Sequence, residues 1–91
     1  MEKSFIFNIE SHSECKYHTT IKVKEEEFQS IIAKREIPAK NIFFAEKYLK
    51  DHYKTYHITK VSIFYNENGI EKELYFEELV DYFNSLVKND E

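Results

Sequence analysis

The sequence predicts a small α+β protein in which two β-hairpins form a mainly antiparallel four-stranded sheet, with helices packed on one face. Apolar residues recur at every second position in four segments and at helical spacing in three others, which distinguishes strands from helices. The segments follow the order ββααββα, and consecutive hairpins favour antiparallel pairing. With 91 residues, one glycine and one proline, the chain leaves no room for a flexible linker, so residues 1–91 are expected to form a single compact domain.

The first hairpin is predicted over residues 5–10 and 16–24, where apolar and polar side chains alternate as in half-buried strands. In the second segment the polar positions are mostly lysines. A run of polar residues separates the two segments and turns the chain. The side chains expected to face the core from this hairpin are Phe5, Phe7, Ile9, Tyr17, Thr19, Ile21 and Val23.

Two helices are predicted between the hairpins. The glutamates at positions 25–27 suit the positive N-terminal end of a helix dipole. Pro38 is expected to end this first helix, because the residue before a proline avoids the α conformation. The same proline suits the first turn of a second helix, which is expected over residues 39–53.

The second hairpin has the strongest local signal in the chain, the pair Asn68-Gly69, which is typical of a type I′ turn. This turn is expected to join strands over residues 56–66 and 70–74. A last helix follows over residues 76–87, since its apolar side chains form one stripe. The short acidic segment 89–91 is expected to be a solvated tail.

The composition excludes several classes of protein. No apolar run approaches the roughly 18 residues that span a bilayer, and the first residues lack the apolar stretch of a secretory signal. The single cysteine excludes an internal disulfide and fits a reducing compartment. We therefore expect a cytoplasmic protein without a membrane partner. The chain has only one arginine, which argues against sequence-specific reading of DNA bases.

Charge is distributed unevenly along the chain, whose net charge is −4. Residues 34–60 contain 7 basic and 3 acidic side chains, whereas residues 61–91 contain 2 basic and 8 acidic ones. On the second predicted helix, four lysines surround one aromatic side chain on the side opposite the core. This candidate binding surface, for a protein partner or for nucleic acid, consists of Lys40, Phe43, Lys47, Lys50 and Lys54. Lysines of the 16–24 strand would extend it if that strand lies nearby.

Motifs for catalysis or cofactors are weak. His12, Cys15 and His18 place three potential metal ligands within seven residues, but a closed zinc site needs four. A thiolate nucleophile at Cys15 would need an orienting group that the sequence does not identify. The chain has no phosphate loop, nucleophile elbow or dinucleotide fingerprint. We expect neither a metal site nor a cofactor, and no enzymatic activity.

Three hypotheses of function follow. The first is a non-catalytic interaction module that binds and inhibits a larger nucleic-acid-handling protein, such as a nuclease or ribonucleoprotein. The bias toward residues with AT-rich codons, 44 against 6 with GC-rich codons, suits a phage or mobile-element anti-defence protein such as an anti-CRISPR. The second is a single-stranded RNA- or DNA-binding protein that uses the lysine and aromatic helix face. The third is a small metal- or thiol-dependent enzyme around Cys15.

Self-association is a further expectation from the sequence. The segment Phe5-Ile6-Phe7 is apolar at consecutive positions, so the first strand would be apolar on both faces. If that strand lies at a sheet edge without protection, it would pair with a second chain. A homodimer formed through this strand therefore stands beside the monomer as an alternative.

Overall fold

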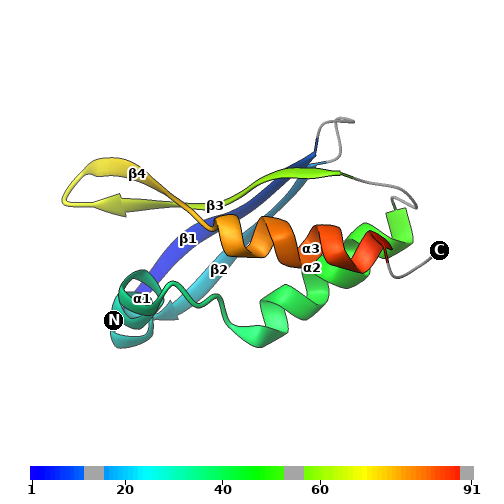
Figure 1. Ribbon diagram of the computed structural model, residues 1–91. Helices are drawn as coiled ribbons and strands as arrows, with labels where there is room; N and C mark the ends of the chain where they lie inside the picture. The colour runs from blue at the N-terminus through cyan, green and yellow to red at the C-terminus, as the bar shows by residue number, and fades with distance from the viewer. Residues whose placement is uncertain (12–15, 53–56, 89–91) are drawn as a thin grey trace.

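The computed structural model describes residues 1–11, 16–52 and 57–88, and it confirms the predicted fold class and the order ββααββα (Figure 1). Some predicted features, including residues 53 and 56 at the ends of two segments and the tail at 89–91, lie outside the described residues. The elements are β1 (Glu2–Ser11), β2 (Lys16–Lys24), α1 (Glu25–Lys34), α2 (Ala39–His52), β3 (Ile58–Glu67), β4 (Ile70–Tyr75) and α3 (Glu77–Lys88).

The four strands form one antiparallel sheet with the order β2-β1-β3-β4. β1 pairs with β2 on one side and with β3 on the other, so it is a central strand. The condition for a homodimer through this strand, an unprotected sheet edge, is therefore not met, because β3 returns to pair with the side of β1 that the first hairpin leaves open. The apolar run Phe5-Ile6-Phe7 belongs to the middle of the sheet, and the edges are β2 and β4.

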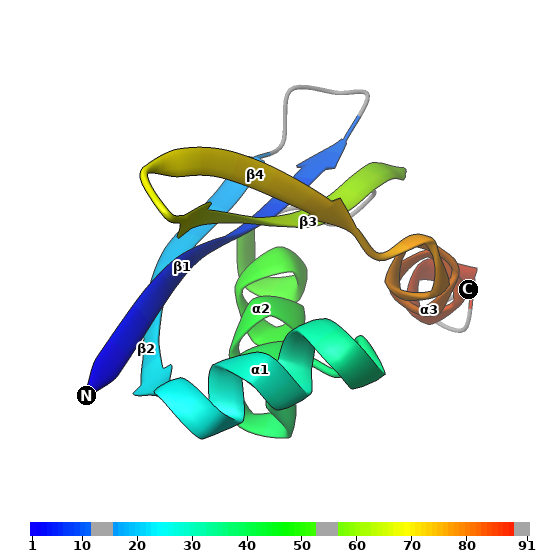
Figure 2. The same cartoon turned by 90° about the vertical axis from the view of Figure 1, so that its left-hand side faces the viewer.

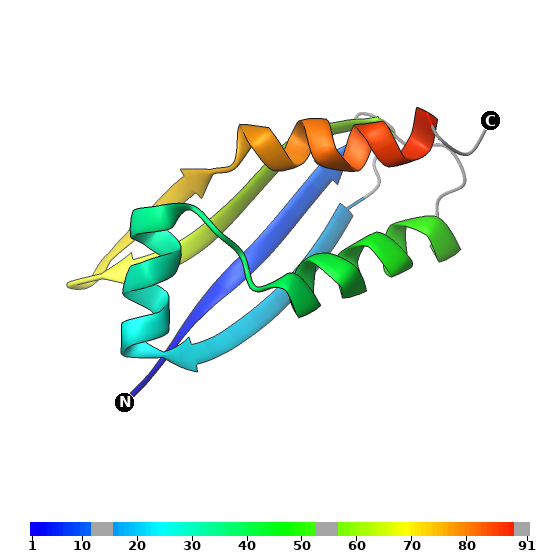
Figure 3. The ribbon, with the colours of Figure 1, turned by 60° about the horizontal axis from the view of Figure 1, so that its bottom comes forward.

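The described helices all lie on one face of the sheet, which gives the molecule two layers (Figures 2 and 3). The hydrophobic core fills the space between the layers. Phe7, Ile9 and Ile63 from the sheet are fully buried there together with Leu49 of α2 and Phe83 of α3. The opposite face of the sheet carries no helix among the described elements. The structure therefore confirms that core-facing and outward-facing residues alternate along β1 and β2, as the sequence predicts.

The first helix ends earlier than Pro38, which corrects the sequence-based expectation. α1 ends at Lys34, and Arg35 adopts the left-handed conformation with φ 57°. The Arg35 N–H donates a hydrogen bond to the Ile31 carbonyl at 2.8 Å, which satisfies one of the free carbonyls at the helix end. Pro38 instead precedes α2, and its carbonyl accepts a hydrogen bond from the Asn41 N–H at 2.9 Å.

Local signals in the second half of the chain are confirmed. Asn68 and Gly69 have φ of 53° and 84°, as a type I′ turn requires. The Asn66 side-chain oxygen accepts a hydrogen bond from the Gly69 N–H at 2.9 Å. The imperfect alternation near the start of β3 has a cause in its pairing, because the register between β1 and β3 shifts between Glu10 and Ser11.

Candidate functional site

The predicted binding surface lies on α2, and the structure exposes most of it. Lys40, Phe43, Lys47 and Lys50 follow one another at helical spacing along one side of the helix and are all exposed. The Phe43 side chain is 61% exposed, which is unusual for an aromatic residue in a small domain. Lys54, the remaining residue of the predicted surface, lies outside the described residues.

A second exposed aromatic residue adjoins the first. Phe44, which the helical pattern places beside the core, is 56% exposed, and its ring meets the Phe43 ring edge to face at 5.9 Å between centroids. The opposite side of α2 is anchored in the core by Ala45 and Leu49, which are fully buried. Because these two residues fix the rotation of the helix, Phe43 is held away from the core.

Phe43 borders a groove between α2 and α3. The groove has a volume of about 500 Å³, within the range of roughly 300–1,000 Å³ that is usual for ligand pockets. Its apolar surface comes from both helices, and its described lining residues include Ile42 and Phe43 from α2 and Leu79 and Tyr82 from α3. A smaller hollow of about 220 Å³ adjoins Phe43, Lys47 and Lys50, so the ring separates two concave surfaces.

Polar contacts hold the two helices at this separation. The Tyr82 hydroxyl donates a hydrogen bond to Glu46 Oε2 at 3.0 Å, across the gap from α3 to α2. This hydrogen bond is the main reason that the pKa of Tyr82 is raised above its usual value, so the hydroxyl stays protonated around neutral pH. Glu46 also accepts an ion pair from Lys50 at 3.4 Å.

Arg35 contributes to the lining of the groove near α3. Its guanidinium donates hydrogen bonds to the Tyr75 carbonyl and to Glu78 Oε1, and its Cζ lies 5.1 Å from the centroid of the Phe76 ring. Arg35, with its left-handed backbone, begins the segment that joins α1 to α2. The residue that ends α1 is therefore also part of the groove, a coincidence that no local pattern in the sequence indicates.

The exposed charges of the two helices differ in sign. On α2, Lys40 and Lys47 form no ion pair with any described residue, whereas Lys50 is paired with Glu46. Over residues 77–86 of α3 the exposed charged side chains are acidic, and one of them, Glu78, is paired with Arg35. The lysines lie outside the groove, and Lys47 and Lys50 instead line the smaller hollow beside Phe43.

Other residues singled out from the sequence do not join this site. Lys16, Lys22 and Lys24 alternate along β2 with the core residues Ile21 and Val23, so they face away from the helices. They do not extend the basic surface of α2, although β2 and α2 are in contact through Tyr17 and Tyr48, whose ring centroids are 5.0 Å apart.

The three weak metal candidates are not brought together among the described residues. His12 and Cys15 lie outside the described residues, and His18 is exposed on the helix-free face of the sheet. Within residues 1–11, 16–52 and 57–88, no group of three histidine, cysteine or acidic side chains has the geometry to hold a metal ion. No helix in these ranges is long and apolar enough to cross a membrane.

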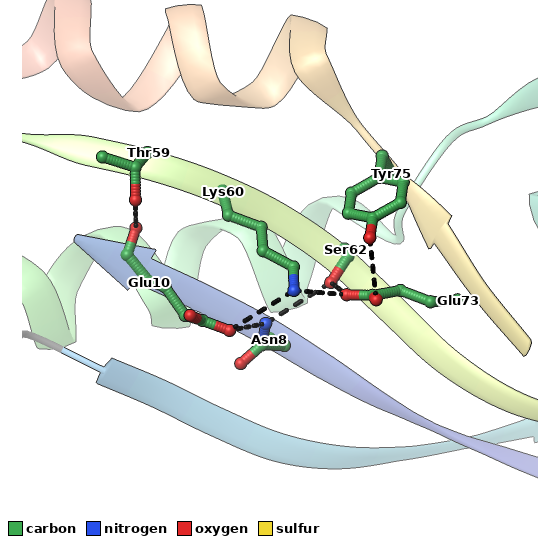
Figure 4. A network of polar contacts seen from close by, with 7 residues as sticks. All are labelled: Asn8, Glu10, Thr59, Lys60, Ser62, Glu73 and Tyr75. Carbon is green, nitrogen blue, oxygen red and sulfur yellow. Dashed lines mark hydrogen bonds and ion pairs between the residues drawn. The ribbon is translucent and has the colours of Figure 1, made fainter. Parts of the chain in front are cut away.

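A polar network on the helix-free face was not predicted from the sequence (Figure 4). Lys60 lies between two carboxylates, with its Nζ 2.8 Å from Glu73 Oε2 and 3.7 Å from Glu10 Oε2. Beneath these groups, Asn8 and Ser62 are fully buried. The Asn8 amide donates to Glu10 Oε2 at 2.8 Å, and the Ser62 hydroxyl donates to Glu73 Oε2 at 2.7 Å.

The network favours the charged forms of its members. The hydrogen bond from Asn8 is the largest influence on Glu10, whose pKa is lowered, with a further contribution from Lys60. Burial would raise the pKa of Glu73, but hydrogen bonds from Lys60, Ser62 and Tyr75 together lower it. The hydrogen bond to Glu73 raises the pKa of Lys60. With both carboxylates and the ammonium ionised at neutral pH, the network has no group poised to exchange a proton.

Comparison of the chain with protein-family models, with curated proteins and with solved structures gives no significant match. The geometry of the groove is therefore the basis for assigning a function.

Proposed function

We propose that this protein is a non-catalytic interaction module that binds a larger protein through the groove between α2 and α3. The observation that carries this proposal is the exposure of Phe43, at 61%, on the border of an apolar groove of about 500 Å³. An aromatic side chain buries about 150–250 Å² when it is covered, and such residues dominate the energy of protein interfaces. A partner side chain in the groove would cover Phe43 and contact Ile42 and Leu79 at the same time.

The lysines beside Phe43 indicate the chemistry of the partner. Lys47 lines the smaller hollow next to the Phe43 ring, and neither Lys40 nor Lys47 forms an ion pair with a described residue. A segment that places an apolar side chain in the groove and acidic neighbours toward these lysines of α2 satisfies both features. Such complementarity sets orientation and partner choice more than it sets affinity.

Single-stranded nucleic acid is the second candidate for this surface, since lysines flank an exposed ring on α2. Two features disfavour it. Lys50 is already paired with Glu46, which leaves Lys40 and Lys47 as the cations available to phosphates on the described part of the stripe. Two phosphate contacts predict a slope of only about −1.4 in a plot of log affinity against log salt. The exposed acidic residues of α3, Glu77, Glu78 and Asp81, would repel the rest of a polyanion.

The wider proposal concerns the kind of partner. The exposed glutamates and aspartate of α3, which include Glu77 and Asp81, present negative charge that a basic, nucleic-acid-binding protein attracts. Together with the α2 surface, this charge supports a partner such as a nuclease or ribonucleoprotein, whose activity the bound module would inhibit. An anti-defence protein of a phage or mobile element, such as an anti-CRISPR, is the biological setting that we propose for it.

Affinity purification from the native host, with and without nuclease treatment, tests this function when it is combined with matched variants. We expect the amount of retained partner protein to fall at least about tenfold in Phe43→Ala and in Lys47→Glu, as for central interface residues. Ile70→Ala and Lys34→Glu serve as controls, because Ile70 is 62% exposed on β4 and Lys34 is exposed on α1. Both controls should retain the partner regardless of nuclease treatment.

Two results would overturn the proposal. If Phe43→Ala retains the partner as well as the unchanged protein does, the groove is not the binding site. If the retained material is nucleic acid that nuclease removes, the second candidate replaces the first. A partner that is retained after nuclease treatment and lost only in the two α2 variants is the result that the groove predicts.

A further inference from the structure

The helix-free face of the sheet has a charge pattern that is complementary to itself. Every second residue of each strand points to this face, away from the core. On the β2 edge the charged residues of this face are basic, Lys16, Lys22 and Lys24, whereas on the β4 edge they are acidic, Glu71 and Glu73. The two edges therefore carry opposite charge, about three strand spacings or roughly 14 Å apart.

The middle of this face is partly apolar. Ile6 of β1 and Phe64 of β3 are directly paired, and Ile6 is 38% exposed. Tyr75 is 50% exposed beside them. Lys60 lies across this area, with its Nζ 5.7 Å from the centroid of the Phe64 ring and 5.4 Å from that of the Tyr75 ring. Its charge is already shared with Glu10 and Glu73, so the centre of the face presents no unmatched cation.

We propose that a second copy of this chain binds here, face to face, about a twofold axis that runs parallel to the strands between β1 and β3. Such an axis exchanges the two edges, so the β2 edge of each copy faces the β4 edge of the other. Sheets packed in this way keep their strands within about 30° of each other. This surface lies on the opposite side of the sheet from the α2–α3 groove, so the inference does not depend on the proposed function.

The rows of the sheet supply the contacts. Lys22 is paired with Ser4, and Asn66 with Glu71. The register of the last β1–β3 pair, Ile6 with Phe64, puts these four residues in line, so the twofold axis brings Lys22 of each copy to Glu71 of the other. Neither residue forms an ion pair with any described residue. A hollow of about 260 Å³, lined by Phe64 and Glu71 among others, provides space for the incoming lysine stem.

The adjacent rows match in the same way. Thr20, Ile6, Phe64 and Glu73 form the next row, in which Ile6 of one copy meets Phe64 of the other. In the row beyond it, His18 meets Tyr75, while the central residues Asn8 and Ser62 are fully buried within each copy and make no contact with the other. No row places like charges opposite each other.

The size of the face limits the affinity. Strands about 4.8 Å apart and residues about 3.3 Å apart give roughly 500 Å² per copy, or about 1,000 Å² in total. This area is at the lower end for a specific interface, so we expect a dissociation constant on the order of 10 μM. The dimer would present its two α2–α3 grooves on opposite outer sides, which allows bivalent binding to a repeated partner.

Two other occupants fit this face less well. Among the charges that point to it there are four lysines and four glutamates, so the face lacks the excess positive charge that nucleic acid requires. Pairing between two β2 edges would bring the lysines of both copies side by side, and lysine on an edge strand is a recognised protection against such pairing.

Sedimentation equilibrium of the full chain, from about 5 to about 500 μM at low salt, tests the dimer through charge reversal. Because symmetry repeats the Lys22–Glu71 contact, Lys22→Glu or Glu71→Lys alone should raise the dissociation constant about tenfold. The double variant Lys22→Glu with Glu71→Lys restores the contact with opposite polarity and should recover the original value within about threefold.

Matched controls carry the same charge changes on α1. Lys34→Glu and Glu26→Lys, both at exposed positions, should leave the dissociation constant within about twofold of the original. Circular dichroism confirms that each variant is folded. A chain that stays monomeric up to the highest concentration overturns the proposal, as does a dimer that the single reversals leave intact. A double variant no stronger than the singles overturns it as well. None of these outcomes bears on retention of a partner at Phe43, so the two proposals fail independently.

Discussion

At the start of β3, where β4 does not pair with it, the side chain of Asn84 makes the hydrogen bonds that a neighbouring strand would make. Its removal tests the packing between α3 and the sheet. The Ile58 N–H donates to Asn84 Oδ1 at 2.8 Å, and Asn84 Nδ2 donates to the Ile58 carbonyl at 2.9 Å. β4 pairs with β3 only from Ser62 onward. The side-chain amide therefore satisfies both backbone groups of a residue that is only 1% exposed.

The magnitude follows from the burial of Ile58. An unsatisfied buried backbone group costs about 1–3 kcal/mol. Asn84→Ala leaves two such groups, the N–H and the carbonyl of Ile58. The cost of each is at the lower end of this range, because Asn84 is only partly buried. Alanine recovers about 0.6 kcal/mol through its higher helix propensity. We expect the free energy of unfolding to fall by about 2 kcal/mol net, and the melting temperature to fall by roughly 10–15 °C in a domain of this size.

Urea unfolding followed by circular dichroism measures this loss, with Ser85→Ala on the exposed side of α3 as the control. Asn84→Asp adds a second criterion. Its carboxylate still accepts from the Ile58 N–H but cannot donate to the carbonyl until it is protonated. Its deficit relative to the unchanged protein should therefore shrink as the pH falls through the pKa of the new carboxyl. A loss below about 0.5 kcal/mol for Asn84→Ala would refute the assigned role.

Two further predictions concern the groove helix and the polar network. Leu49→Ala should lower the free energy of unfolding by about 2–5 kcal/mol, because Leu49 is fully buried. Phe43→Ala should change it by less than about 0.5 kcal/mol, because Phe43 is 61% exposed. Equal losses of stability in thermal unfolding would contradict the exposed position of Phe43. The lowered pKa values of Glu10 and Glu73 stabilise the fold at neutral pH, and this stabilisation is lost as the pH falls through their folded-state pKa values. Lys60→Met should make the loss of stability between about pH 5 and pH 3 shallower, and an unchanged acid slope would show that Lys60 does not hold the carboxylates ionised.

Local patterns predicted the elements well because they depend on neighbouring residues. Alternation over residues 16–24 matches β2 in full, and Asn68-Gly69 forms the expected turn, since positive φ is a property of those two residues themselves. The end of α1 was placed too late for the same reason. Pro38 carries a clear local signal, whereas the left-handed turn at Arg35 is held by contacts with Tyr75, Glu78 and Phe76 from the far end of the chain.

Only the α2 side of the candidate site was predicted from the sequence. Helical spacing was sufficient to place Phe43 with Lys40, Lys47 and Lys50, because all four share one helix. The groove beside them depends on Leu79 and Tyr82 of α3, which follow Phe43 by 36 and 39 residues in the sequence. No periodicity within one helix indicates which other helix will lie beside it.

By itself, the sequence determined which segments are strands and helices, which side of each faces the core, and that α2 presents lysines around an aromatic ring. Only the tertiary structure decided that β1 is central, that α2 and α3 enclose a groove beside Phe43, and that Asn8, Lys60 and Glu73 form one network on the other face. The division has a physical reason. Side-chain periodicity is set by the backbone of each segment, whereas neighbours in space are chosen by burial and hydrogen bonding summed over the whole chain.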